Sequence, residues 1–202
     1  MTCLHNKLCT IDIFVLAAGM SKRFGKKNKL LAEFKNSTII GNVVDNLLLA
    51  YPYTINVVVG FNKEDVMKEL ENKKVNFINN SEHLKGQSSS VIKAIENINK
   101  SCKSVMLCLG DMPYITPKEY LKIMLAHLKF GGSRTITVPF DNKRGNPVIL
   151  GDKYFPIIKK LNGDIGAKNI IDSFPNKINK VKLFSKNCFI DLNTKRDLEN
   201  FN

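Results

Sequence analysis

The first segment suited to chemistry follows an apolar run near the N-terminus and reads LAAGMSKRFGKKNK over Leu16–Lys29. Its candidate residues combine small size, a hydroxyl group and positive charge: Ala17, Ala18, Gly19, Ser21, Arg23 and Lys29. Small residues allow backbone N–H groups to approach a phosphate closely. The segment departs from a Walker A loop, because five residues rather than four separate Gly19 from Gly25, and it lacks the GxGxxG spacing. A polyphosphate site and an ordinary solvated basic loop both remain open from the spacing alone.

The second candidate is Asp111, which follows the apolar run Val105–Leu109 through Gly110. If that run is a strand, the carboxylate lies at the carboxyl edge of a sheet. A hard oxygen ligand at such an edge suits Mg²⁺ that is bound jointly with nucleotide phosphates. The alternative is an aspartate that starts a turn into Pro113.

A third segment, Gly86–Ser90 (GQSSS), precedes apolar residues that recur at helical spacing. The start of a helix offers free backbone N–H groups, and the serines add hydroxyls. Ser88, Ser89 and Ser90 as ordinary helix caps are the alternative to ligand contact.

The net charge of the chain is strongly positive. The 202 residues include 31 Lys or Arg against 18 Asp or Glu, a balance of +13. The basic residues are 27 Lys and only 4 Arg, alongside 23 Asn and 20 Ile, which indicates a bias spread over the whole chain. Proteins that read nucleic acids depend on Arg, and the absence of Trp removes one kind of stacking residue. We therefore expect no nucleic-acid partner.

Composition also limits the class of protein. An apolar share of 44% with 24% charged residues is typical of globular chains, and no run reaches the roughly 20 apolar residues of a membrane span. The five Cys are an odd number without a CxxC pair, and the three His form no metal-binding motif. Cys108 lies in an apolar run and is expected to be buried. With no signal-peptide pattern in MTCLHNKLCT, we expect a cytoplasmic protein.

Apolar patterning predicts alternating strands and helices through the first 130 residues. The predicted strands there are Ile11–Ala17, Ile55–Val59, Val75–Ile78 and Val105–Leu109. The predicted helices run from Ser37 to before Pro52, over about Lys63–Glu71, along the Val91–Ile98 face, and onward from Thr116 with Pro117 and Glu119 as start signals. In the final third, two brief helices accompany the predicted strands Thr135–Val138, Val148–Leu150, Val181–Phe184 and Cys188–Leu192.

Such alternation predicts right-handed βαβ units and a mostly parallel sheet buried on both faces. We expect residues 1–202 to form one α/β domain. Ligands of such domains bind beyond the carboxyl ends of the strands, near a topological switch point. The candidate loops after the first and fourth predicted strands lie where such a site belongs.

The loop Leu16–Lys29 resembles the (L)AAGxSxRxG…K signature of sugar-nucleotide-type nucleotidyltransferases. Within that superfamily the chain most resembles the molybdenum cofactor nucleotidyltransferases, the MobA/MocA-like group, and especially their cytidylyltransferase branch. The other resembling segments follow in family order: GQSSSV from Gly86, LGDMPYIT from Leu109, RGNPVIL from Arg144, GDIGAKNII from Gly163 and FIDLNTKRDL from Phe189. The resemblance implies a three-layer α/β/α Rossmann-like nucleotidyltransferase fold with a mostly parallel, mixed central sheet.

The resemblance also implies site roles, carried over position by position. The implied nucleotide-binding residues are Leu16, Ala17, Ala18, Gly19, Ser21, Arg23, Lys29, Asn79, Gly86, Ser88, Ser89 and Asp111. Of these, the implied catalytic residues are Arg23, Lys29 and Asp111. The implied acceptor-binding residues are Gly145, Asn146, Asp164 and Gly166, and the implied metal ligands are Asp111 and Asp191. Asn193 stands where the family usually has a second acid, and it offers a carbonyl oxygen without charge.

The activity that follows is Mg²⁺-dependent transfer of CMP from CTP to a phosphate acceptor, with release of pyrophosphate. The resemblance implies molybdopterin carrying molybdenum as the acceptor, and contact with a molybdoenzyme or its maturation factor. Another nucleoside triphosphate with a sugar or polyol phosphate is the alternative. A nucleotide sensor without catalysis and a basic nucleic-acid-binding module are the alternatives that are not enzymes.

Overall fold

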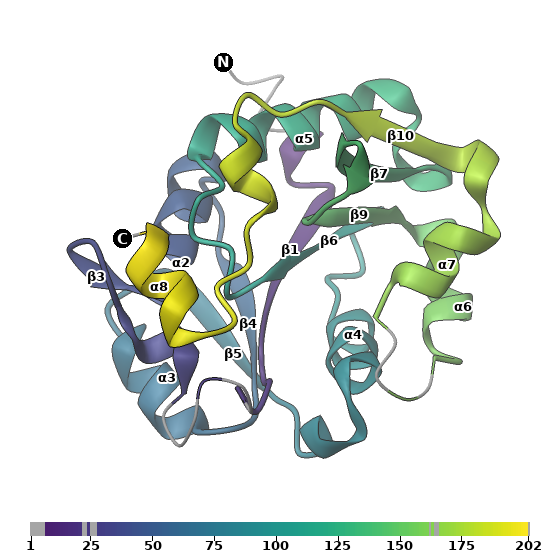
Figure 1. Ribbon diagram of the computed structural model, residues 1–202. Coiled ribbons are helices and arrows are strands. Elements are labelled where there is room, and N and C mark those ends of the chain that lie inside the picture. The colour runs from purple at the N-terminus through teal and green to yellow at the C-terminus, as the bar shows by residue number, and fades with distance from the viewer. Residues whose placement is uncertain (1–6, 22–23, 25–27, 162, 164–165, 202) are drawn as a thin grey trace.

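The computed structural model describes residues 7–21, 24, 28–161, 163 and 166–201. A mixed sheet crosses it with strand order β10-β7-β9-β6-β1-β4-β5, and β8 pairs with β7 (Figure 1). These strands are β1 (Ile11–Ala17), β4 (Ile55–Val59), β5 (Val75–Asn79), β6 (Ser104–Leu109), β7 (Ile136–Asp141), β8 (Lys143–Arg144), β9 (Val148–Gly151) and β10 (Ile178–Val181). A separate antiparallel pair consists of β2 (Glu33–Phe34) and β3 (Ser37–Thr38).

Strands β5, β4, β1 and β6 run parallel, so their carboxyl ends share one edge of the sheet. Leu16, near the end of β1, pairs with Val58 of β4 on one side and with Leu109 of β6 on the other. The chain moves outward from β1 to β4 and β5, then returns to place β6 on the other side. The switch point predicted from the sequence therefore lies between β1 and β6.

The next strand, β9, runs antiparallel to both of its neighbours, β6 and β7. Strand β10 runs parallel to β7 and closes that end of the sheet. The prediction of a mostly parallel, mixed sheet is confirmed.

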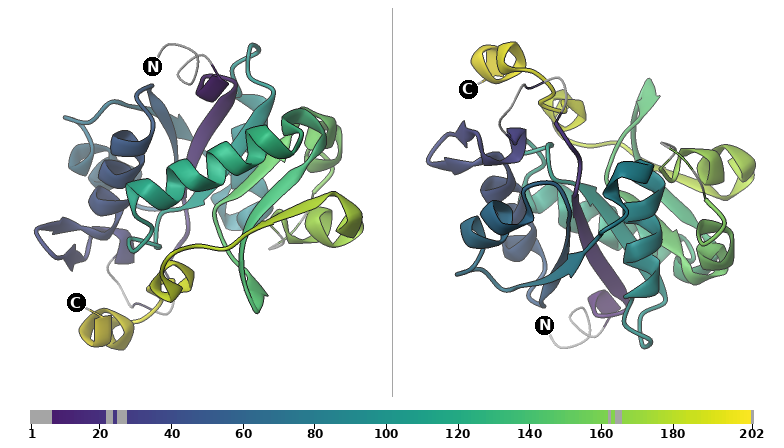
Figure 2. Two further views of the ribbon diagram at one scale, coloured as in Figure 1. Left: turned by 90° about the horizontal axis from the view of Figure 1, so that it is seen from above. Right: turned by 90° about the horizontal axis from the view of Figure 1, so that it is seen from below.

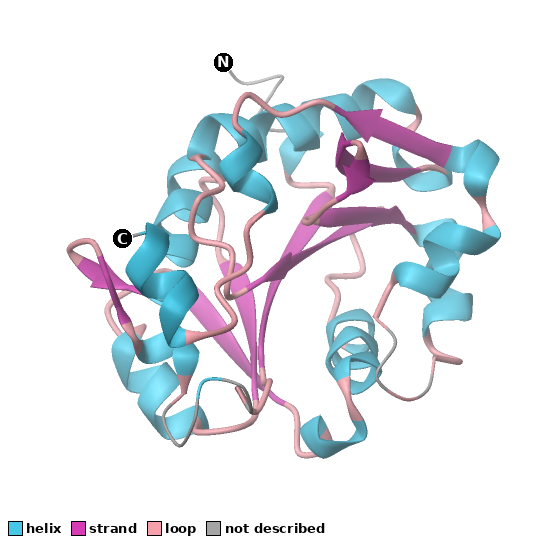
Figure 3. Ribbon diagram, in the orientation of Figure 1, coloured by secondary structure: helices cyan, strands magenta, loops and turns pink. Residues whose placement is uncertain are grey.

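Helices cover both faces of the sheet, which gives the three layers visible in Figures 1–3. They are α2 (Ile39–Ala50), α3 (Lys63–Glu69), α4 (Gln87–Glu96), α5 (Pro117–Phe130), α6 (Phe155–Ile158), α7 (Lys168–Ser173) and α8 (Lys195–Phe201). Apolar residues of α2, α3 and α5 pack in one core cluster with β1, and those of α4, α6 and α7 pack in a second cluster across the sheet. No helix among the described residues is long and apolar enough to cross a membrane.

The local start signals act as predicted at α5. Glu119 accepts hydrogen bonds from the backbone N–H and the hydroxyl of Thr116, each at 2.9 Å, which completes the capping box ahead of Pro117. At α2 the hydroxyl of Thr38 accepts from the N–H of Gly41 at 3.0 Å. Both helices therefore begin directly after a threonine N-cap, Thr38 for α2 and Thr116 for α5.

Two predicted strands near the C-terminus are wrong. Strand β10 is Ile178–Val181, so Val181–Phe184 overlaps it by one residue only. The predicted strand Cys188–Leu192 begins in a 3₁₀ turn over Lys186–Phe189 and continues as irregular chain. Its apolar side chains belong to two different clusters, since Cys188 packs in the main core and Leu192 packs with Phe34 and Ile39.

Candidate active site

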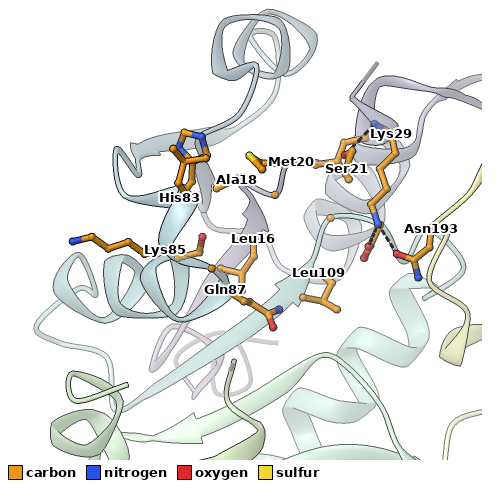
Figure 4. A pocket seen from close by; sticks show the side chains of 17 residues that line it. Leu16, Ala18, Met20, Ser21, Lys29, His83, Lys85, Gln87, Leu109 and Asn193 are labelled. Atoms are coloured by element: carbon orange, nitrogen blue, oxygen red, sulfur yellow. Dashed lines mark hydrogen bonds and ion pairs between the residues drawn. The ribbon is translucent and has the colours of Figure 1, made fainter. Parts of the chain in front are cut away.

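A cavity of about 580 Å³ opens at the shared carboxyl edge of β1 and β6, the switch point of the sheet. Five stretches of the chain line it: Leu16 and Ala18–Ser21, Lys29–Leu30, His83–Gln87 with Ser90, Leu109–Asp111, and Asn193. Figure 4 shows Lys29 and Asn193 at one end of this first cavity and His83 and Lys85 at the other. The Lys29 end thus carries charges of both signs, while Leu16 of β1 and the small residues after it lie between the two ends.

The loop after β1 places its small residues at the cavity wall. Leu16, Ala18, Gly19 and Ser21 line the cavity, whereas Ala17 is buried in the core on the other side of the strand. A Cβ added to Gly19 would meet no described atom within 4 Å, so its backbone faces open space. Arg23 lies outside the described residues.

Ser21 and Asn28 shape the turn that brings Lys29 back to the cavity. Ser21 has a positive φ of 51°, and its hydroxyl accepts the backbone N–H of Lys29 at 3.2 Å. Asn28 is buried and accepts the N–H of Leu30 at 3.1 Å, while its amide donates to the carbonyl of Phe61 at 3.4 Å. These bonds fix the start of the Lys29 side chain.

Lys29 and Asp111 form an ion pair at the charged end of the cavity, and their side chains are only 14% and 16% exposed. The Lys29 ammonium also donates to Oδ1 of Asn193 at 2.9 Å. The amide of Asn193 in turn donates to Asp191, which is exposed and does not line the cavity. The four residues therefore form one polar chain from Asp111 to Asp191.

The same residues present oxygen atoms to a divalent cation. Oδ1 of Asp111 is buried and accepts no hydrogen bond from the described residues. Buried polar atoms are normally paired, so an unpaired carboxylate oxygen fits a cation ligand. No group of three or more His, Cys, Asp or Glu side chains in the described part of the chain is placed to hold a metal. A cation at Asp111 would therefore need oxygen ligands from elsewhere, such as phosphates and water.

The serine segment forms the first turn of α4, rather than preceding the helix as predicted. Gly86, with φ of 94°, is the N-cap, and Gly86 and Ser90 line the cavity. Ser88 donates its hydroxyl to the carbonyl of Gly163, and Ser89 bonds back to Gly86 at 2.8 Å. Ser88 and Ser89 thus hold the backbone and do not line the cavity.

Asn80 holds this turn in place and was missed by the sequence prediction. Asn79 ends β5 but is exposed and away from the cavity lining. Its neighbour Asn80 is completely buried and donates to the hydroxyls of Ser89 at 2.9 Å and Ser90 at 3.0 Å. The signal was the Asn-Asn pair itself, since successive residues of a strand face opposite sides.

A second cavity of about 670 Å³ adjoins the first, and the two share Gln87 and Leu109 as walls. It contains three of the implied acceptor residues, Gly145, Asn146 and Gly166; Asp164 lies outside the described residues. Four basic side chains outside the implied acceptor-binding residues also line it: Lys143, Arg144, Lys168 and Lys180. Arg144 and Lys168 lie in the resembling segments RGNPVIL and GDIGAKNII. Among the described lining residues none is acidic, although Arg144 forms an ion pair with Asp172 nearby.

The buried cysteines have no part in this site. Burial raises the pKa of Cys102 to about 11 and that of Cys188 to about 12, and it raises the pKa of Cys108 further still. Thiols with raised pKa values are poor nucleophiles at neutral pH. The prediction that Cys108 is a buried residue of the core is confirmed.

Comparison with known proteins adds to this geometry. Residues 13–180 match the family described as the MobA-like NTP transferase domain. The Bifunctional protein GlmU of Francisella philomiragia is 31% identical over 149 residues, which is 72% of this chain and 31% of that protein. The chain thus spans about a third of the length of the curated relatives it matches.

Solved structures share the fold at low sequence identity. A nucleotidyl transferase from Methanothermobacter has a TM-score of 0.82 at 18% identity, with 94% of each chain covered. Rv0371c from Mycobacterium tuberculosis has a TM-score of 0.78 at 21% identity, covering 94% of this chain and 95% of that one. A 4-diphosphocytidyl-2C-methyl-D-erythritol synthase from Anaerococcus prevotii has a TM-score of 0.72 at 14% identity, with 96% of each chain covered.

Proposed function

The chain belongs to the MobA-like NTP transferase domain family, and from that premise we propose that it transfers a nucleotidyl group from a nucleoside triphosphate to a phosphorylated small molecule. The observation that carries the proposal is the pair of adjoining cavities. The first cavity has the ion pair of Lys29 and Asp111 at one end. The second cavity is lined by basic side chains, and Gln87 and Leu109 line both cavities. Two anionic substrates could therefore meet at the shared wall.

The triphosphate belongs in the first cavity. The Ala18–Gly19 backbone, the Ser21 hydroxyl and the Lys29 ammonium are the phosphate-binding groups, and Arg23 adds charge from the same loop. Gly86 and the start of α4 then lie beside the base and ribose. Ser88 and Ser89 stabilise that turn through hydrogen bonds to the backbone. CTP is the proposed donor, because the LAAG form of the loop resembles the cytidylyltransferase branch.

The reaction needs no covalent intermediate on the protein. An oxygen of the acceptor phosphate forms a bond to the α-phosphorus, the bond from that phosphorus to its bridging oxygen breaks, and pyrophosphate leaves with the electron pair. Lys29 holds the α-phosphate, and Arg23 offsets charge on the leaving group. Catalysis then comes from positioning and electrostatic stabilisation.

Asp111 is the residue that would hold Mg²⁺, through its unpaired Oδ1, and Asp191 would support it. The chemistry of the bound cation is neutralisation of phosphate charge. The manganese complex solved for Rv0371c of Mycobacterium tuberculosis, at 19% identity and a TM-score of 0.74, shows a relative of the same fold with a divalent cation.

The acceptor belongs in the second cavity, beside Gly145, Asn146 and Gly166, with Asp164 in the same stretch of sequence. Its basic lining supports a phosphorylated acceptor. Molybdopterin carrying molybdenum is proposed on the family resemblance, and with it contact with a molybdoenzyme or its maturation factor. A sugar or polyol phosphate is the second candidate, which the synthase from Anaerococcus prevotii makes reasonable by its fold alone.

The test is release of pyrophosphate from CTP, GTP, UTP and ATP, each with molybdopterin, a sugar phosphate, a polyol phosphate or no acceptor. We expect release with CTP, Mg²⁺ and molybdopterin together. Replacing Asp111 by Ala should reduce that rate by at least about a hundredfold while thermal unfolding stays cooperative. Asp152→Ala, which alters a half-buried acid that lies 3.9 Å from Lys103 and outside both cavities, is the matched control. Full activity of Asp111→Ala would contradict the proposed role of that residue. Binding of CTP without release of pyrophosphate, with every acceptor tested, would favour a nucleotide sensor that does not catalyse transfer.

A further inference from the structure

The polar chain from Asp111 to Asp191 affects how a divalent cation and a triphosphate bind to the site. The Lys29 ammonium bonds both Asp111 and Asn193, with both ion-pair side chains largely shielded from solvent. Shielded charges interact more strongly than exposed ones, so the ammonium neutralises the carboxylate that would otherwise attract a cation.

Asn193 is oriented for this contact. Its backbone N–H donates to Asp197 at 3.0 Å, and its side-chain NH₂ donates to Asp191. The amide oxygen is therefore the atom that faces Lys29, at 2.9 Å. The reversed amide would place an NH₂ group against an ammonium and a carbonyl against a carboxylate, which are two repulsive contacts.

Asparagine at position 193 also sets the charge of the site. With an amide there, the acids of the polar chain are Asp111 and Asp191, and Lys29 offsets one of them. An acid at position 193 would add a third carboxylate and attract a cation whether or not Lys29 stayed on Asp111. The amide instead gives the ammonium a second partner without adding charge.

We propose that Asn193 is a positioning residue that holds the Lys29 ammonium on Asp111, and that this contact weakens the binding of a divalent cation at Asp111 until a polyphosphate draws Lys29 away. The inference rests on the proposed function, which assigns Lys29 to phosphate and Asp111 to the cation. A cation and an ammonium on one carboxylate repel each other, so binding of one weakens binding of the other. A triphosphate offers Lys29 another anionic partner and thereby frees Asp111. Binding of a triphosphate therefore strengthens binding of the cation, and binding of the cation strengthens binding of the triphosphate.

The first test measures Mn²⁺ binding to the full chain without nucleotide. The electron paramagnetic resonance signal of free Mn²⁺ reports how much of the ion remains unbound. Lys29→Met should tighten Mn²⁺ binding about tenfold, because it removes the competing charge and keeps the length of the side chain. Lys73→Met is the matched control, since Lys73 pairs with Asp45 at 2.6 Å and its loss also frees a carboxylate, but one away from the cavity. It should change Mn²⁺ affinity by less than about twofold.

The second test examines Asn193 through a double-mutant cycle. Asn193→Leu should tighten Mn²⁺ binding about threefold in the wild-type background and have no effect in the Lys29→Met background, because the amide acts through Lys29. Weaker Mn²⁺ binding by Asn193→Leu in both backgrounds would make the residue a cation ligand and overturn its positioning role.

The third test is the reciprocal one, with CTP in the presence of EDTA. Asp111→Asn should tighten metal-free CTP binding about fivefold, since it weakens the hold on Lys29, and Asp45→Asn should leave it unchanged. Unchanged Mn²⁺ affinity of Lys29→Met would overturn the inference while leaving the proposed function intact. Failure of the wild type to bind any triphosphate would remove the proposed function, and the nucleotide-free Mn²⁺ titration would still decide the inference.

Discussion

The backbone N–H of Leu192 donates a hydrogen bond to the carbonyl oxygen of Asp111 at 3.0 Å. This bond joins the C-terminal segment to the loop after β6, two regions far apart in the sequence. The Leu192 side chain is completely buried beside Phe34 and Ile39, so the segment is anchored by packing as well. The position of Asn193 next to Lys29 therefore depends on contacts made outside the cavity.

Glu119 is the main polar anchor of that segment, and its removal should destabilise the fold. The buried carboxylate accepts from Thr116 and from the backbone N–H of Ser185 at 3.1 Å. Glu119→Ala should lower the free energy of unfolding by about 2–4 kcal/mol, because buried donors lose their acceptor. Glu119→Gln keeps an acceptor oxygen and should cost less. Urea unfolding measures both.

The control for Glu119 is Glu96→Ala, which removes an exposed acid paired with Lys93 and should cost less than about 1 kcal/mol. Equal effects of Glu119→Ala and Glu96→Ala would contradict the anchoring role. Burial alone would raise the pKa of Glu119, but the Cys188 thiol, Thr116 and Ser185 stabilise its charged form and lower the pKa overall. Its contribution to stability should therefore be complete above its ordinary pKa and be lost as the pH falls through the lower folded value.

His127 should make the fold sensitive to mild acid. The ring is completely buried, with Nδ1 2.9 Å from the Thr137 hydroxyl and Nε2 2.8 Å from the Ser104 hydroxyl. Burial lowers the pKa of His127 from 6.5 to about 4. Between these values the unfolded chain binds a proton that the folded chain does not, so stability falls as the pH drops. The loss should reach about 3 kcal/mol near pH 4 and be absent above about pH 7.

Urea unfolding at pH 7.5, 6 and 5 measures this dependence, and His127→Gln provides the comparison. Glutamine does not titrate, so the variant should lose the part of the slope that His127 contributes. A slope between pH 6 and 5 that is identical in the two proteins would show that another group is responsible.

Gly19→Ala should separate nucleotide binding from stability. An added Cβ at Gly19 meets no described atom within 4 Å, so the melting temperature should be unchanged or slightly higher. The same Cβ projects where the phosphates are proposed to lie, and CTP affinity should fall about tenfold. Isothermal titration measures the affinity. Gly131→Ala, at a φ of 132° outside both cavities, should do the reverse by lowering stability and sparing CTP binding.

Lys180→Gln should affect the acceptor and spare the donor. Lys180 lines the second cavity, with its ammonium 4.3 Å from the ring centre of Phe140. Removing this charge should raise the KM for a phosphorylated acceptor by about three- to tenfold without changing CTP affinity. Lys177→Gln removes another exposed charge, one that does not line the cavity, and the KM of this variant should match that of the wild type. A fall in CTP affinity of Lys180→Gln would contradict the division between the two cavities.

The strands and helices of the first half could be predicted from the sequence, because most have a local apolar periodicity and some helices have a local start signal. Strand β1 has the predicted bounds, and the helix start at Thr116 follows from residues four positions apart or fewer. The placement of Asp111 after β6 followed from the rule on carboxyl ends of parallel strands.

Contacts between distant segments could not be predicted in this way. The apolar residues Cys188–Leu192 have the pattern of a strand, yet Cys188 packs in the main core and Leu192 packs with Phe34 and Ile39. The contact of Lys29 with Asn193 and the bonds from Asn80 to the α4 serines depend on loop geometry that a single sequence does not encode locally.

The reversed strand β9 divides the molecule into parts that can change separately. On one side of it, the parallel strands β6, β1, β4 and β5 carry the loops around the first cavity. On the other side, β7, β8 and β10 form one part of the second cavity wall, and the stretch 166–175 forms another. Residues 142–146, which include β8, join β7 to β9. If the acceptor binds in the second cavity as proposed, exchange of residues 142–146 between related chains would alter which acceptor is taken and leave the residues of the first cavity unchanged. A fold built this way can acquire new substrates by replacing one short surface loop at a time.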